Sequence, residues 1–231
     1  MRKALLVLLV LLIGGVIAAD RLGVRFAEDE IARQVSAQYD LKQEPEVEIH
    51  GFPFLTQAIG GEYDKIDVKL GQWTERGVTV GDVTVEMRGV QAPLSEVAAG
   101  NSNNITAREA TASAVIPYSV IKQQAPKEVT GIAAKGENLQ VDLSGSVAGF
   151  PLSGSAVVAV KPSAKGIVIT PISGGLTGLP QLPAVGQLVS WTVPVANLPV
   201  GSRISRIEPT PEGLRVSATA QNVRLNDLPT A

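Results

Sequence analysis

The side chains suited to catalysis or metal binding are few in this sequence of 231 residues. It contains one histidine, His50, and no cysteine, which excludes sites built on several histidines or on thiolates. Asp64 and Asp67, with Glu62 nearby, offer oxygen ligands for a hard cation. They lie at the start of an alternating apolar pattern, where the outward residues of a strand are expected to be polar. We favour a solvated strand face over a metal site.

The short motifs of common enzyme sites are also missing. No G-x-S-x-G nucleophile elbow, phosphate-binding P-loop or H-E-x-x-H zinc helix is present. The segment SGGLTG from Ser173 to Gly178 has the glycines of a phosphate loop but lacks its lysine. His50 follows Ile49 at a predicted strand end, which is typical of a surface histidine. We expect no catalytic residue and no cofactor; a hydrolase with an unrecognised Ser or Asp site is the weaker alternative.

Charge and cysteine content narrow the range of possible binding partners and of stabilising interactions. Lysine and arginine total 20 against 22 aspartates and glutamates, and no long basic run occurs. Nucleic acid is therefore not an expected partner. Without cysteine there is neither a disulfide nor a lipid-modified thiol, so stability has to come from packing.

The first 19 residues have the pattern of an export signal. Arg2 and Lys3 precede an uninterrupted apolar run from Ala4 to Ala19, and charge resumes at Asp20. The run is shorter than the roughly 20 residues of a comfortable membrane span, which favours a signal peptide. The poor small-x-small cleavage site leaves an uncleaved signal anchor as the alternative. We expect residues 1–19 to be the leader and residues 20–231 to form a single domain in an exported, envelope-facing location.

After the leader, the sequence has first the apolar period of a helix and then that of strands. Apolar residues recur at three- and four-residue steps from Val24 through Ile31 and Val35 to Tyr39, which predicts an amphipathic helix. Beyond Pro45 the apolar period becomes two, interrupted by glycine-containing turns, and this predicts antiparallel strands. A second short helix is predicted at 117–124. The class is α+β, mainly β.

Two segments then show a resemblance. The first is GFPFLTQAIGGEYDKIDVKL, which begins at Gly51, and the second is LPVGSRISRIEPTPEGLRVSATAQNVRL at 198–225. With the N-terminal apolar segment and the helix before them, they resemble the LmeA-like phospholipid-binding family of actinobacterial cell-envelope proteins. The resemblance implies a tubular lipid-binding-like fold, in which a highly curved antiparallel sheet wraps around a long N-terminal amphipathic helix. It also implies phospholipid binding in an apolar groove, transient membrane contact and no catalysis.

Candidate lipid contacts follow from that expectation. Ile31 and Val35 lie on the helix stripe that would line the groove. The segment from Phe52 through Phe54 to Leu55 forms either an apolar lip at the groove entrance or a plug in the core. We expect Phe52 to be the plug and Phe54 and Leu55 to be the lip.

A rival entrance is the apolar tract at 179–195, with candidate contacts Leu179, Leu182 and Trp191. Tryptophan is frequent at membrane interfaces, which favours this placement. The predicted function is non-enzymatic binding and carriage or presentation of phospholipid in the cell envelope. The alternative is a β-rich envelope domain that binds a protein partner and has a filled core.

Overall fold

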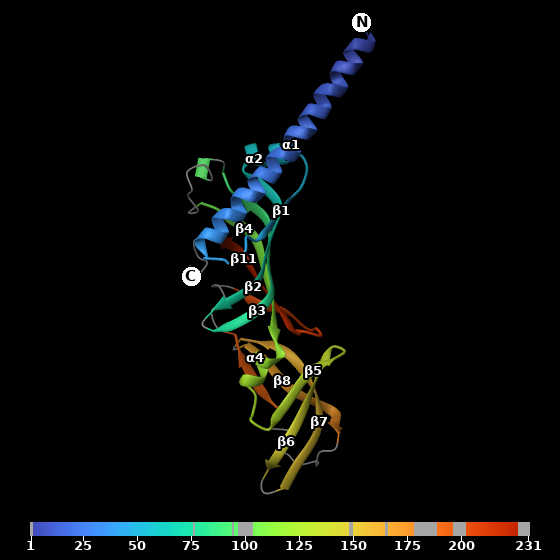
Figure 1. The fold of residues 1–231 in the computed structure, drawn as a ribbon, viewed down its shortest axis with the longest axis vertical. Coiled ribbons are helices and arrows are strands. Elements are labelled where there is room, and N and C mark those ends of the chain that lie inside the picture. Colours follow the sequence, from blue (N-terminus) through green and yellow to red (C-terminus); the bar gives the residue numbers. More distant parts are fainter. Residues whose placement is uncertain are drawn as a thin grey trace. The chain divides into compact units, whose positions relative to one another are not determined.

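The computed structural model describes residues 2–75, 77–93, 95–96, 104–147, 150–164, 166–177, 189–195 and 202–225. Strands dominate, a long helix leads the chain, and the antiparallel sheet is strongly curled (Figure 1). The α+β, mainly β prediction is confirmed. In chain order the elements are α1 (Arg2–Gln38), β1 (Glu46–His50), α2 (Phe54–Gly60), β2 (Glu62–Glu75), β3 (Val78–Gln91), β4 (Thr106–Pro117), α4 (Tyr118–Gln123), β5 (Val129–Lys135), β6 (Asn138–Val147), β7 (Phe150–Ser163), β8 (Gly166–Thr177), β9 (Trp191–Pro194), β10 (Arg203–Pro209) and β11 (Gly213–Arg224).

The chain divides into two compact units. Unit 1 comprises 1–70, 84–111 and 220–231, and unit 2 comprises 71–83 and 112–219. One sheet has the strand order β1-β2-β3-β4-β11-β10, and a second has the order β5-β6-β7-β8-β9. Strands β2, β3, β4 and β11 contribute residues to both units. The single domain over 20–231 stays a prediction.

Unit 1 is built on one continuous helix. The apolar leader and the amphipathic stripe, which differ in composition, both belong to α1, and no break separates them. No proline occurs within α1, and Gly14 and Gly15 are tolerated inside it at a modest cost in helix propensity. The apolar part of α1 is long and apolar enough to cross a membrane, a property that signal sequences share.

The core of unit 1 lies between α1 and the sheet. Strand β1 pairs antiparallel with β2, so that Val47 faces Val68 and Ile49 faces Ile66, and all four side chains are buried. Val24, which belongs to the predicted stripe, and Ala32, which does not, complete the buried cluster from the helix. The period of two on the strands and the period of 3.6 on the helix thus meet in one apolar layer.

Unit 2 has its own core on the β5–β9 sheet. These strands form a meander in which each strand pairs antiparallel with the next. Leu139, Val141, Val158, Ile167 and Ile169 are completely buried there. The short helix predicted at 117–124 is confirmed as α4, whose Ile121 joins the same cluster.

Candidate lipid-binding site

The G-F-P-F-L-T-Q segment forms a braced junction between β1 and β2. Gly51 has a φ of +106°, a conformation that side chains rarely adopt, and a Cβ there would collide with the Gln57 amide. That amide donates a hydrogen bond from Nε2 to the His50 carbonyl (3.2 Å), and its Oε1 accepts one from the Asp64 backbone N–H (2.9 Å). Gly51 and Gln57 therefore hold the two strand ends around helix α2. The first and last positions of the motif have a structural role.

The two phenylalanines of the motif face opposite ways, and the predicted division between them is wrong. Phe54 is 7% exposed, belongs to the unit 1 core, and has its ring tilted against Tyr63 with a centroid separation of 6.3 Å. Phe52 is 58% exposed and lies under the Arg21 guanidinium. The reason is that α2 begins at Phe54, which turns this side chain inward and leaves Phe52 on the preceding loop. Leu55 is exposed, as expected for a lip.

Partly buried apolar side chains from α1 and from the sheet pack against the buried cluster of unit 1, and we call this set the seam between α1 and the sheet. Ile31 from the helix and Leu70, Val85 and Met87 from the strands pack against the buried cluster without being fully buried themselves. Val35, one turn beyond Ile31, is also partly buried. Unit 2 also has partly buried apolar side chains against its core, such as Ile132 and Val160, but its largest core residues are completely buried. Along this seam unit 1 therefore has apolar surface that the chain itself does not cover completely.

The remaining candidates lie elsewhere. Trp191 belongs to unit 2, where it is partly buried against the core, and its buried Nε1 has no hydrogen-bond partner among the described atoms. Leu179 and Leu182 lie outside the described residues. The structure therefore brings Ile31 and Phe54 together in unit 1, places Leu55 and Phe52 at the edge of that unit, and places Trp191 in the other one. Whether any of these residues contacts lipid stays a prediction.

A polar network on the outer face of β1 and β2 contains the single histidine. His50 Nε2 and Lys65 Nζ each lie 2.8 Å from Asp67 Oδ2, and Lys65 also lies 3.0 Å from Glu86. Burial favours neutral Asp67, but the hydrogen bonds from Lys65 and His50 outweigh it and hold the pKa of Asp67 below its usual value. The hydrogen bond from Lys65 likewise lowers the pKa of Glu86.

The same network includes Glu48, whose carboxylate approaches the other ring nitrogen of His50 at 3.8 Å. Glu48, His50 and Asp67 are spaced closely enough to hold a metal ion. The Lys65 ammonium, however, already neutralises the Asp67 carboxylate at Oδ2. The arrangement is that of an ion-pair network that ties adjacent strands together, and the absence of a metal site stays a prediction.

A separate depression of about 590 Å³ lies in unit 2. Its lining is Gly136, Glu137, Arg206, Ile207, Glu208, Pro209 and Thr210. Three of the seven side chains are charged, and one, Ile207, is a large aliphatic. Such a surface suits water and small polar molecules better than acyl chains.

Sequence reasoning overlooked the exposed apolar side chains around α2. Leu22 and Phe26 on α1, each 69% exposed, and Ile59 on α2, 82% exposed, were not among the candidates. Leu22 and Phe26 are one helical turn apart and fall off the stripe that begins at Val24. Two apolar residues one turn apart on the polar side of an amphipathic helix are the sequence signal that could have indicated this exposed surface.

Comparison with known proteins gives one result. Neither the curated proteins nor the solved structures contain a match. A family model described as LmeA-like phospholipid-binding matches residues 18–219, which include the stripe of α1, helix α2 and the strands from β1 to β10. The family is one of lipid-binding proteins and not of enzymes. The chain therefore belongs to the LmeA-like phospholipid-binding family.

Proposed function

We propose that this protein carries or presents phospholipid in the cell envelope without changing it chemically, and that an acyl chain occupies the seam between α1 and the sheet of unit 1. The observation that supports this location is the set of partly buried apolar side chains on both sides of the seam, including Ile31, Leu70 and Met87. Family membership supports phospholipid as the ligand class.

The dimensions of the seam suit an acyl chain. The stripe from Val24 to Val35 extends over 11 helical steps, or about 16 Å. Strand β2 has 14 residues and β3 has 14, so the sheet opposite is long enough to match it. A chain lying along the stripe would exchange water for contacts with aliphatic side chains over that length.

The energetics favour reversible exchange. Each methylene transferred from water gains about 0.8 kcal/mol, but a methylene in a bilayer already has that gain. Moving a lipid from the membrane into the seam therefore has a small net hydrophobic free energy, and uptake and release are both accessible. This is the behaviour of a carrier, and contacts with the head group have to supply any selectivity.

The proposed location is outside the cytoplasmic membrane. Arg2 and Lys3 precede the apolar part of α1, and positive charge before an apolar segment keeps that end on the cytoplasmic side. The remainder of the chain is then exported. The continuity of α1 supports retention of the segment as an anchor, because its last turns pass directly into the buried stripe.

Native mass spectrometry and lipid extraction of the gently purified full-length protein test the proposal. We expect phospholipid to co-purify with the wild-type protein and to be lost from Ile31→Asp, because a carboxylate in the seam repels an acyl chain. Ala37→Asp is the matched control, since Ala37 is exposed on the same helix. A wild-type chain that is repeatedly free of lipid would contradict the proposal and favour the protein-interaction alternative. Incubated lipid that is recovered hydrolysed would contradict the absence of catalysis.

A further inference from the structure

We propose that unit 1 docks on the surface of the phospholipid bilayer that the apolar part of α1 enters, at the end where α1 meets α2. The docking face consists of Leu22, Phe26, Phe52, Leu55 and Ile59, all of which are exposed. Aromatic and aliphatic side chains gathered on adjacent segments mark a contact surface. The inference rests on the membrane retention in the proposed function but not on lipid carriage.

Three contacts make the docking face one surface. Asp20 Oδ1 accepts a hydrogen bond from the backbone N–H of Leu55 at 2.9 Å, which joins α1 to the first turn of α2. Gly23 lies against the Leu55 side chain, since a Cβ built there would be in van der Waals contact with it at 3.5 Å. The Arg21 guanidinium lies 5.0 Å from the centroid of the Phe52 ring. The loop and α2 are thus fixed against the helix where it leaves the unit (Figure 1).

The apolar side chains on the two helices follow helical spacing. Leu22 and Phe26 are one turn apart on α1, and Leu22 is the neighbour of Gly23, against which Leu55 packs. Leu55 and Ile59 are one turn apart on α2. Each helix therefore presents one apolar turn, and the contact at Gly23 brings the two turns side by side.

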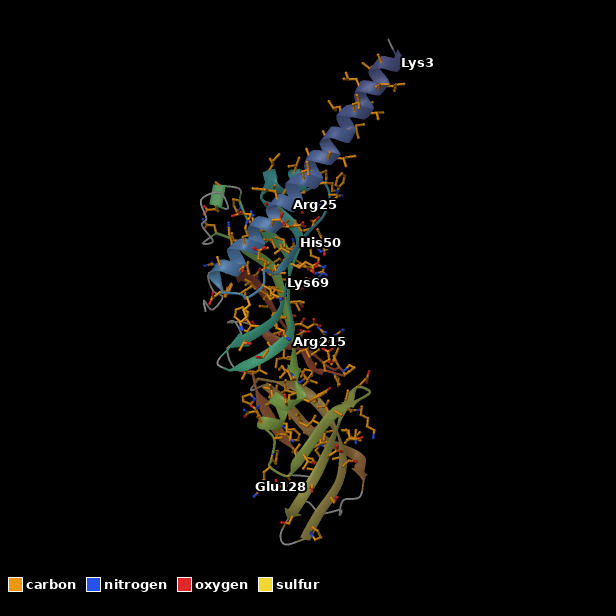
Figure 2. The ribbon with its side chains drawn as sticks, viewed as in Figure 1. Lys3, Arg25, His50, Lys69, Glu128 and Arg215 are labelled. Atoms are coloured by element: carbon orange, nitrogen blue, oxygen red, sulfur yellow. The ribbon has the colours of Figure 1, made fainter. Side chains whose placement is uncertain are left out.

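Lengths along α1 place this face at the membrane boundary. The run from Ala4 to Ala19 is about 24 Å long, whereas the hydrocarbon core of a bilayer is about 30 Å thick. The missing length is about four residues, which extends the boundary to Gly23. Lys3 and Arg21 are 18 residues apart, or about 27 Å, so each cation lies within one helical turn of a boundary of the core. Figure 2 shows Lys3 at the free end of α1 and Arg25 where the helix meets the strands.

Charge distinguishes a phospholipid surface from a second copy of the chain as the occupant. Arg21 and Arg25 are both exposed, are one turn apart, and would lie at the depth of the lipid phosphates. The carboxylate beside them, Asp20, is 1% exposed and engaged with α2, so it does not face the lipid. A face of this composition, continuous with a membrane-entering helix, fits a phospholipid bilayer, whose apolar interior lies beneath anionic head groups.

The test uses single cysteines, which the chain itself lacks. Ile59→Cys and Ala37→Cys are labelled with an environment-sensitive dye in the full-length protein. Each is reconstituted in vesicles of equal parts phosphatidylcholine and phosphatidylglycerol, in which some lipids have a nitroxide quencher near the head of the acyl chain. Ala37 is exposed on α1 about 22 Å beyond Leu22, and serves as the matched control. We expect a blue shift and severalfold stronger quenching at Ile59 than at Ala37.

A second comparison separates docking from mere tethering. In a Phe26→Glu/Phe52→Glu background, quenching at Ile59 should fall to the level at Ala37. Quenching of a label at Val10→Cys, inside the apolar segment, should be unchanged. Both phenylalanines are exposed, so the fold is expected to survive, and circular dichroism checks this. Lipid co-purification should be unchanged in the single variant Phe26→Glu, whose side chain is not among the candidate lipid contacts, and this keeps the inference distinguishable from lipid carriage.

Three results at Ile59 would overturn the inference, and a fourth concerns Val10. The three are equal quenching at Ile59 and Ala37, a blue shift at Ile59 without quenching by the lipid, and retention of quenching at Ile59 in the Phe26→Glu/Phe52→Glu background. The second of these would indicate contact with another protein chain. Loss of quenching at Val10 in the same background would show that insertion of the helix, and not docking, had changed.

Discussion

The opposite placement of Phe52 and Phe54 gives a sharp test of the fold of unit 1. Replacement of a buried phenylalanine by alanine costs about 3 to 5 kcal/mol of unfolding free energy. Phe54 is nearly fully buried and loses its contact with Tyr63 as well, so we expect about 4 kcal/mol for Phe54→Ala. Phe52→Ala removes an exposed ring and its contact with Arg21, for which we expect less than about 1 kcal/mol.

The difference of about 3 kcal/mol corresponds to roughly a hundredfold change in the unfolding equilibrium. Urea unfolding of full-length protein in mild detergent measures it. Trp73 and Trp191 both belong to unit 2, so their fluorescence does not report directly on unit 1. A dye on Ala37→Cys, on α1, supplies the missing signal, and circular dichroism follows both units. Equal midpoints for the two alanine variants would show that the assigned orientation of the two rings is incorrect.

Three further predictions concern other parts of the chain. Gly51→Ala should lose about 2 kcal/mol of stability because of its positive φ and the collision with Gln57, whereas Gly60→Ala, with open space around it, should change stability little in the same urea titration. The lowered pKa values of Asp67 and Glu86 mean that their contribution to stability is present above the ordinary carboxyl range and lost as the pH falls below about 4. Asp67→Asn should therefore flatten the acid limb of the stability profile, and an unchanged limb would show that the network does not contribute. Ile31→Ala should lower both the thermal stability and the amount of bound lipid. Because Ile31 is only partly buried, we expect a loss of unfolding free energy of about 2 kcal/mol, at the low end for a buried aliphatic residue.

Local patterns were sufficient to predict the elements but not the orientation of individual side chains at their ends. The stripe from Val24 to Val35 and the alternation on β2 depend on periods within one segment, and the structure has both. Which of Phe52 and Phe54 faces the core depends on where α2 begins and on its packing against α1. Both depend on contacts between segments that are distant in the sequence. Phe54 and Leu55, which follow Pro53, already belong to helix α2.

The junction at Asp20 was not predictable for a related reason. The change in composition there suggested a boundary between leader and domain, but nothing in that stretch interrupts a helix. Asp20 is instead buried, with its carboxylate accepting the N–H of Leu55 from a segment 35 residues later. A contact over that distance leaves no signature in one sequence. The exposed Leu22 and Phe26 were visible, but their importance emerges only beside Ile59.

The strand order described above has a consequence for how the chain folds. In the β5–β9 sheet every strand pairs with its neighbour in sequence, and the connections from β5 to β8 are two residues each, so these contacts are local and can form as the chain emerges. In the other sheet β11 lies beside β4, and all of β5–β10 intervenes along the chain. Closing that loop costs more conformational entropy, and the β4–β11 pair has to wait for the last strand of the sequence. The β5–β9 sheet is therefore expected to form early, and the six-stranded sheet to be completed only when synthesis of the chain is nearly finished.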